Sequence, residues 1–265
     1  MNNRKILVTN DDGIDGAGLK SLVEKLSAVG GVDVYVLAPD SNRSAVSSLL
    51  TMTEPMKFVR RRDKGERWFS CSGSPVDCVI AALCSTLFGE SVKFDAVFSG
   101  INKGANLGTD IVYSGTCAAA RQSVLYDIPG IAVSVESYDG TWKFDDVADF
   151  CAKNLDRLIS LCRSGSSEKS SCDLFVSVNA SSSDNHKDAV FTSLSARDYC
   201  DRISILNDPN ENADVFYGFF RGGQIKSNVR DRRSPLDFDV SFGGGISVTR
   251  VFAEPTAFDD SGSIF

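Results

Sequence analysis

A single histidine in 265 residues restricts the enzymatic chemistry open to this chain. His186 stands in a polar loop, "SSSDNHKD". One histidine argues against a Ser–His–Asp triad, and no Cys–His pair is suggested either. It also argues against a zinc site, which draws on histidine and cysteine ligands. Chemistry that depends on oxygen ligands is not excluded.

Common nucleotide-binding signatures are absent as well. No G-x-x-x-x-G-K-[ST] segment occurs, which argues against a P-loop kinase or NTPase. No G-x-G-x-x-G follows the first predicted strand, which weakens the case for a dinucleotide cofactor. That strand ends in Asn-Asp-Asp and not in the Asp-x-Asp expected for an aspartyl-phosphate mechanism. Metal-assisted hydrolysis by activated water remains.

The chain also has no apolar run long enough to span a bilayer, and "MNNRKILVTN" reaches a polar turn too soon for a signal peptide. Its eight cysteines include no C-x-x-C pair, and several lie in apolar stretches such as "CVIAALC". We interpret them as reduced, mostly core-filling thiols. A cytoplasmic protein without a membrane partner is therefore expected.

The charge balance is acidic, with 28 basic and 35 acidic residues and a formal net charge of −7. This balance argues against binding of a nucleic-acid polymer or an anionic membrane. A small anionic substrate remains possible if a cation and local donors receive it.

Strands and helices alternate over the first 135 residues. Apolar runs predict strands at 5–9, 32–39, 94–100 and 130–135, a pair of short strands at 56–61 and 67–72, and helices at 16–30, 74–88 and 114–127. Ser74 is the expected N-cap of its helix, with Pro75 as first residue. A long helix at 143–162 and a strand at 172–180 follow. The alternation predicts an α/β fold: a Rossmann-like, mainly parallel sheet with helices on both faces.

The pattern changes near residue 186. Short β-like runs at 189–194, 214–222 and 245–252 lie among Gly, Asn, Asp and Pro, without convincing helices. We expect one domain over 1–265, with a core at 1–185 that carries the site and a β-rich arm or hairpin extension at 186–265.

Three polar loops, at 9–16, 38–45 and 99–116, each follow a predicted strand. Since loops after parallel strands gather at one sheet edge, they form a joint site hypothesis. Asp11 and Asp12 can share a ligand only if the chain turns there, which Gly13 permits. Oxygen-only ligands favour a hard cation such as Mg²⁺, Mn²⁺ or Ca²⁺. The alternative is a solvated turn that caps the next helix.

The third loop contains N-x-G-x-N-x-G from Asn102 to Gly108 and then "YSGT", which opens a helix near Ser114. Glycines allow close backbone approach and a helix N-terminus favours an anion, so a phosphate fits here. Plain turns are the alternative, and Asp110 is interpreted as a turn residue.

Five blocks in one order, "ILVTNDDGI", "APDSNRSA", "GSPVDCV", "SGINKGANLG" and "YSGTCAAA", resemble the SurE survival-protein family. The resemblance implies a metal-dependent phosphatase that hydrolyses nucleoside 5′- and 3′-monophosphates, with a possible exopolyphosphatase side activity. It implies one divalent cation per subunit, Mg²⁺ or Mn²⁺. It also implies a C-terminal part that exchanges a hairpin or arm between subunits, in a homodimer or homotetramer.

The resemblance also implies residue roles. Metal ligands would be Asp11, Asp12, Ser44 and Asn102; phosphate contacts would be Asn106, Ser114, Gly115 and Thr116, with Asn10 and Arg43 as further substrate groups. Asp11 or Asp12 would transfer the proton. One departure is Gly16-Ala17-Gly18 where members commonly have Ala-Pro-Gly, which predicts a looser loop. Two alternatives stay open: a nucleotide-sugar transferase, and a nucleotide- or metal-binding sensor without turnover.

Overall fold

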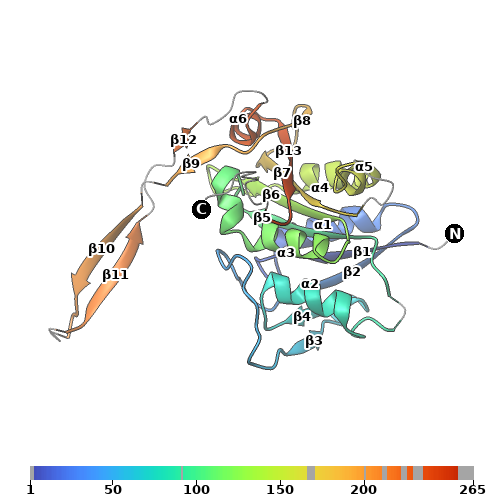
Figure 1. The fold of residues 1–265 in the computed structure, drawn as a ribbon, viewed down its shortest axis with the longest axis horizontal. Coiled ribbons are helices and arrows are strands. Elements are labelled where there is room, and N and C mark those ends of the chain that lie inside the picture. The colour runs from blue at the N-terminus through green and yellow to red at the C-terminus, as the bar shows by residue number, and fades with distance from the viewer. Residues whose placement is uncertain are drawn as a thin grey trace, which may run out of the picture.

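The computed structural model describes residues 3–90, 92–165, 171–199, 201–210, 214–221, 226–228 and 235–255. Nine strands form the central sheet: β1 (Arg4–Thr9), β2 (Val32–Pro39), β3 (Phe58–Arg60), β4 (Trp68–Cys71), β5 (Ala96–Lys103), β6 (Gly130–Glu136), β7 (Leu174–Ser181), β8 (Ala189–Phe191) and β13 (Ile246–Phe252). Their order is β3-β4-β2-β1-β5-β6-β7-β13-β8 (Figure 1). From β4 through β2, β1, β5 and β6 to β7, adjacent strands run parallel. At the two ends of this run, β3 pairs antiparallel with β4, and β13 pairs antiparallel with β7.

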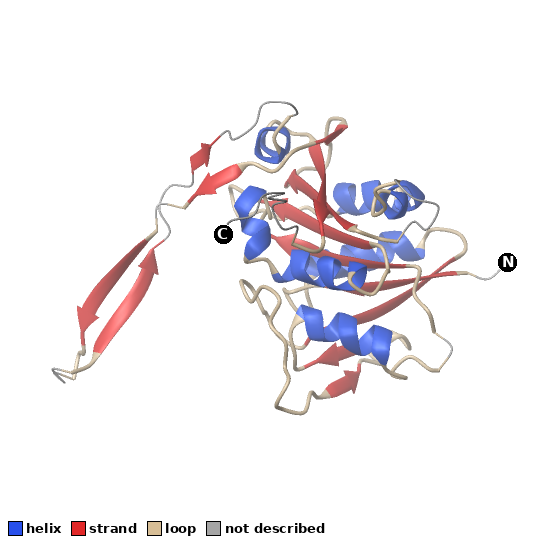
Figure 2. Cartoon of the chain, viewed as in Figure 1, coloured by secondary structure: helices blue, strands red, loops and turns tan. Residues whose placement is uncertain are grey.

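Helices pack on both faces of this sheet (Figure 2). They are α1 (Ala17–Ser27), α2 (Pro75–Cys84), α3 (Gly115–Val124), α4 (Asp145–Lys153) and α5 (Leu155–Ser160). Helix α1 contacts α4, and α2 contacts α3. The predicted α/β fold with a mainly parallel sheet is confirmed. Ser74 caps α2 as expected, and its capping box with Asp77 is complete.

Alternation along β1 shows why these residues form a doubly covered sheet. Ile6 and Val8 belong to one hydrophobic cluster and Leu7 to a second, and all three are fully buried. Since successive strand residues point to opposite faces, the run is apolar throughout because helices cover both faces.

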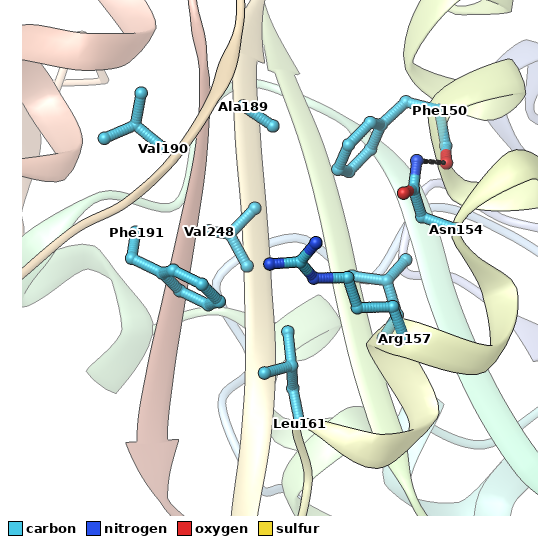
Figure 3. Close-up of a pocket in the computed structure, with 9 residues that line it drawn as sticks. Phe150, Asn154, Arg157, Leu161, Ala189, Val190, Phe191 and Val248 are labelled. Carbon is cyan, nitrogen blue, oxygen red and sulfur yellow. Dashed lines mark hydrogen bonds between the residues drawn. The ribbon is translucent and has the colours of Figure 1, made fainter.

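The single long helix predicted over 143–162 is wrong: the chain forms two helices separated at Asn154. The backbone of Asn154 leaves the helical region, with φ −110° and ψ 19°. Its side-chain Nδ2 donates to the Phe150 carbonyl at 2.9 Å (Figure 3). An asparagine that hydrogen-bonds to nearby backbone competes with the helical pattern, which accounts for the break.

The C-terminal part contributes both to the sheet and to an arm. Strands β13 and β8 extend the sheet beyond β7, so residues after 186 lie in the body as well. An antiparallel hairpin, β10 (Arg202–Asn207) and β11 (Phe216–Arg221), projects from it (Figure 1). It joins the body through paired β9 (Ala196–Asp198) and β12 (Lys226–Asn228). The expected hairpin is confirmed, but the absence of helices is wrong, because α6 (Asp237–Phe242) forms.

Candidate functional site

The candidate site lies at the topological switch point of the sheet. Strand β2, which follows β1 in the chain, lies on one side of β1, and β5 lies on the other side. Loops after β1, β2 and β5 therefore meet at the carboxyl ends of adjacent parallel strands, the usual ligand position in such sheets. Two bonds fasten them: Arg43 N–H donates to the Asp11 carbonyl at 2.7 Å, and Lys103 N–H donates to Asp12 Oδ2 at 3.0 Å.

One pocket of about 330 Å³ opens at this point. Five of the predicted site residues line it: Asp11, Ser44, Asn102, Asn106 and Ser114. The rest of the lining is Ala45, Lys103, Gly104, Ala105, Asp110, Tyr113, Glu136, Arg197 and Tyr199. The volume is in the range of small-molecule sites.

Asp11 is a buried carboxylate held in place by the start of α3. The residue is only 3% exposed. Its carboxylate accepts hydrogen bonds from Thr116 N–H at 3.2 Å and from Thr116 Oγ1 at 2.6 Å. Burial raises the pKa of Asp11 to about 6, with a smaller contribution from the charge of Asp12; the Thr116 bonds oppose this rise. Such a carboxylate is costly to keep ionised without a nearby positive charge.

Asp12 occupies a less enclosed position. Burial raises the pKa of Asp12, and the backbone bond from Lys103, together with the charge of that lysine, opposes the rise. It lies outside the pocket lining but is tied to Lys103, the residue that follows Asn102.

Two glycines allow the close approach of these segments. A Cβ on Gly115 would lie 3.1 Å from both Cβ and Oδ2 of Asp11. A Cβ on Gly18 would lie 2.0 Å from the Ile101 carbonyl oxygen. The looser loop predicted from Gly16-Ala17-Gly18 is therefore wrong: Gly18 packs against the strand that carries Asn102, and Gly16 packs against the Asn10–Gly13 turn.

The neutral oxygen donors are oriented by their own hydrogen bonds. Asn102 Nδ2 donates to the Gly104 carbonyl at 2.7 Å, so Oδ1 is the atom left to face a ligand. A register shift between β5 and β6 falls between Ser99 and Asn102 and re-aims this end of the strand. Ser44 N–H donates to Asn42 Oδ1 at 2.8 Å, which fixes the turn that carries Ser44.

Asn106 and Ser114 complete the predicted phosphate end. Asn106 Nδ2 donates to Ser134 Oγ at 2.7 Å, and its backbone N–H donates to Asn179 Oδ1 at 2.8 Å. Ser114 is the N-cap of α3, and its Oγ accepts from Cys117 N–H at 3.0 Å. The N-terminus of α3 therefore lies at this end of the site, and its Thr116 and Cys117 amides donate to Asp11 and Ser114.

Besides Asp12, four predicted residues are not part of the pocket lining. Gly115 and Thr116 support Asp11. Asn10 is fully buried and closes the turn, because Nδ2 donates to the Gly13 carbonyl at 2.9 Å and Oδ1 accepts from Gly13 N–H at 3.2 Å. Arg43 Nη2 donates to the Ser72 carbonyl at 2.8 Å. In this arrangement Asn10 and Arg43 shape the loops.

Arg197 and Tyr199, which the sequence did not single out, also line the pocket, beside Asp110. Asp110 accepts from Arg197 Nη1, from the Tyr199 hydroxyl and, at 3.1 Å, from Leu107 N–H. It is thus a turn residue, as predicted, but it also binds the segment before the hairpin. Nothing in the spacing of Arg197 and Tyr199 relates them to the earlier loops, so sequence reasoning missed them.

A second carboxylate fastens the same segment. Asp237, 1% exposed, accepts from Gly108 N–H at 2.7 Å and from Ser195 N–H at 2.8 Å. A Cβ on Gly108 would lie 1.9 Å from the Ser195 carbonyl oxygen, so the backbone segments around these two residues are in direct contact. The C-terminal part is therefore built into the wall of the site.

Other places in the fold offer less chemistry. His186 is held by Asp146 and, at 2.7 Å, by the Ser181 carbonyl, away from the pocket. A cavity of about 100 Å³ between α4, α5, β8 and β13 is lined mainly by apolar side chains, together with Asn154 and the charged Arg157 (Figure 3). Within the described residues, no group of three or more His, Cys, Asp or Glu side chains is placed to hold a metal.

Two further predictions concern the whole chain. In the part that the structure describes, no helix has the length and apolar character needed to cross a membrane. Seven cysteines are free thiols, of which only Cys84 is exposed; Cys200 lies outside the described residues.

Comparisons with known proteins agree with this architecture. The family described as "Survival protein SurE" matches residues 6–201. The chain is 43% identical over 198 residues to the 5′-nucleotidase SurE of Treponema pallidum, covering 73% of this chain and 99% of that protein. It is 35% identical over 257 residues to the 5′-nucleotidase SurE of Geotalea uraniireducens, covering 96% and 95%. The crystal structure of the SurE protein from Aquifex aeolicus superposes with a TM-score of 0.72 at 30% identity, covering 95% and 94%. The chain belongs to the SurE survival-protein family.

Proposed function

We propose that this chain is a nucleotidase, a metal-dependent phosphomonoesterase that hydrolyses nucleoside monophosphates to nucleoside and phosphate. The observation that carries the proposal is the pocket in which Asp11, Ser44 and Asn102 meet the N-terminus of α3. Relatives that are named 5′-nucleotidases support the substrate class. Activity on 3′-monophosphates and on polyphosphate belongs to the proposal as well.

The donor set fits one divalent cation. Two carboxylates, a hydroxyl and a carboxamide oxygen are hard ligands of the kind that Mg²⁺ and Mn²⁺ prefer. Burial raises the pKa of both Asp11 and Asp12, and a bound cation would favour their ionised forms. We propose that Asp11, Asp12, Ser44 and Asn102 hold the cation. When bound, it would lower the pKa of a water molecule and offset charge on the phosphoryl group.

The remaining groups orient the phosphate. The positive end of the α3 dipole, where Ser114 is the N-cap, favours an anion. Asn106 is fixed by Ser134 and Asn179, so its carboxamide can donate without rearrangement. Gly115 and Thr116 act through Asp11, and Asn10 and Arg43 through the loops that they close. Asp11, which lines the pocket, is our choice over Asp12 for the proton transfer.

The chain also has the properties expected of an oligomer. The hairpin exposes apolar side chains on both faces: Ile203 lies opposite Phe220 on one face, and Leu206 lies opposite Tyr217 on the other. Exposed apolar surface of this extent marks an interaction site. We propose that it inserts into a second copy of the chain, in a homodimer or homotetramer. The free cysteines support our further proposal of a cytoplasmic location.

Light scattering tests the oligomer. Ile203→Asp and Phe220→Asp place a charge on the paired positions and are expected to give monomers, whereas Asn207→Asp, on the same hairpin, leaves the mass unchanged. A wild-type monomer would contradict the proposal.

Phosphate release tests the activity. The substrates are 5′-AMP, 3′-AMP and polyphosphate, with Mg²⁺, Mn²⁺ or EDTA. We expect turnover of the monophosphates only when a divalent cation is present. Nucleotide binding by calorimetry without phosphate release would favour a sensor in place of a hydrolase.

A further inference from the structure

The pocket is larger than a phosphate needs, and its lining combines two kinds of chemistry. Asp11, Ser44 and Asn102 contribute oxygen donors. Two tyrosines, Tyr113 and Tyr199, line it beside Arg197. If the oxygen donors and their cation take a phosphoryl group, as proposed above, the tyrosines are available to the rest of the substrate.

Tyr113 is an exposed aromatic ring with a fixed backbone. It is 55% exposed, although it directly precedes the N-cap Ser114. Its N–H donates to the Asp110 carbonyl at 3.0 Å, and its own carbonyl accepts from Ser47 N–H at 3.0 Å. A large apolar ring held at the rim of a pocket and left open to solvent is available to stack on a flat ligand.

Tyr199 holds Tyr113 from the side. The two rings meet edge to face, with centroids 6.0 Å apart and an interplanar angle of 80°. The Tyr199 hydroxyl donates to Asp110, which also binds Arg197. With this contact in place, Tyr113 remains exposed to solvent.

Arg197 adds a polar group to the same wall. Its side chain is only 7% exposed, and its Nε has no hydrogen-bond partner among the described residues. A buried donor of this kind needs a partner, and a ligand in the pocket can supply one.

We propose that Tyr113 and Tyr199 form a nucleobase subsite, with Tyr113 as the stacking surface and Asp110 as the positioning residue for Tyr199 and Arg197. This inference rests on the proposed nucleotidase function and deepens it. Stacking uses the π-face that every base has, so the subsite recognises the base as a class and not one base in particular. The Tyr113–Tyr199 subsite would then discriminate a nucleotide from a sugar phosphate that has no base.

The test compares 5′-AMP with ribose 5-phosphate, which has the same phosphate and sugar but no base. We expect Tyr113→Ala to lower kcat/KM for 5′-AMP by roughly 5- to 150-fold, the effect of losing one base–aromatic stack. Hydrolysis of ribose 5-phosphate should stay unchanged. Tyr113→Phe should retain the nucleotide preference. The control is Tyr126→Ala, which removes an exposed tyrosine outside the pocket.

Calorimetry with adenosine and ribose in EDTA gives a readout that needs neither metal nor turnover. Adenosine should bind the wild type more tightly than ribose does, and this difference should disappear in Tyr113→Ala. If the wild type shows this preference for adenosine but releases no phosphate from any of the substrates, the subsite is supported and the proposed activity is overturned. Equal losses for 5′-AMP and ribose 5-phosphate, or no loss for either, would overturn the subsite and leave the activity in place.

Discussion

Thr116 donates two hydrogen bonds to the carboxylate of Asp11, one from its backbone N–H at 3.2 Å and one from Oγ1 at 2.6 Å. The carboxylate that ends β1 is therefore oriented by the first turn of α3. Because Thr116 lies outside the pocket lining, its effect on a ligand passes through Asp11.

Thr116→Val removes the hydroxyl bond and preserves the shape of the side chain. We expect metal affinity to fall roughly 10- to 100-fold, the usual effect of losing a group that orients a metal ligand. Calorimetric titration with Mn²⁺ measures it. Thr116→Ser, which retains the hydroxyl, is the matched control and should bind almost as well as the wild type; equal losses in both variants would refute the orienting role.

Gly115→Ala places a methyl group against Asp11 and, at 3.3 Å, against Pro75. The Asp11 side chain must yield by a few tenths of an ångström. Because a misplacement near 1 Å can reduce a rate by about 100-fold, we expect a smaller loss of kcat/KM for 5′-AMP, on the order of 10-fold. Gly30→Ala, where a Cβ meets nothing within 4 Å, should leave the rate unchanged. Full activity in Gly115→Ala would show that the close approach is not required.

Asp11 should destabilise the metal-free fold at neutral pH. Burial raises the pKa of Asp11 to about 6, above its value near 4 in an unfolded chain. Because the folded state binds the proton more tightly than the unfolded state, protonation of Asp11 stabilises the fold. This contribution to the free energy of unfolding is complete below pH 4 and is lost as the pH rises through 6. The loss is on the order of 3 kcal/mol at most. Asp11→Asn should remove this step from the pH dependence.

Urea denaturation in EDTA between pH 4 and pH 8 measures that difference. The wild type should lose more free energy of unfolding than Asp11→Asn over this interval. Addition of Mn²⁺ at pH 7.5 should stabilise the wild type and not the variant. Parallel curves for the two proteins would contradict the raised pKa.

Asp237→Ala should loosen the C-terminal segment from the wall of the site. It leaves the buried N–H groups of Gly108 and Ser195 without their acceptor. Each unsatisfied group costs about 1–3 kcal/mol, so the free energy of unfolding should fall by roughly 2–6 kcal/mol. Chemical denaturation tests this, with the exposed Asp239→Ala as control. A loss no larger than that of the control would show that Asp237 does not hold the segment.

The sheet and the oxygen donors of the site could be predicted because they depend on local patterns. Fully apolar runs such as β1 identify strands covered on both faces, and parallel topology brings the ends of β1, β2 and β5 together. Asp11, Ser44 and Asn102 therefore lie in one pocket although they are distant in sequence.

The remainder depends on contacts that no local pattern encodes. Asn154 interrupts a helix through one side-chain bond within an otherwise continuous amphipathic run. Arg197 and Tyr199 reach the site only because Asp110 and Asp237 draw their segment onto the loop after β5. Carboxylates that join distant backbone segments look like ordinary surface acids in a sequence.

The decisive measurement is phosphate release from 5′-AMP by the wild type and by a folded Asp11→Asn variant, in Mn²⁺, in Mg²⁺ and after EDTA treatment. We expect turnover that requires a divalent cation and falls more than about 100-fold in the variant, because one ligand of the cation is lost. Turnover that survives EDTA, or that Asp11→Asn leaves intact, would contradict it.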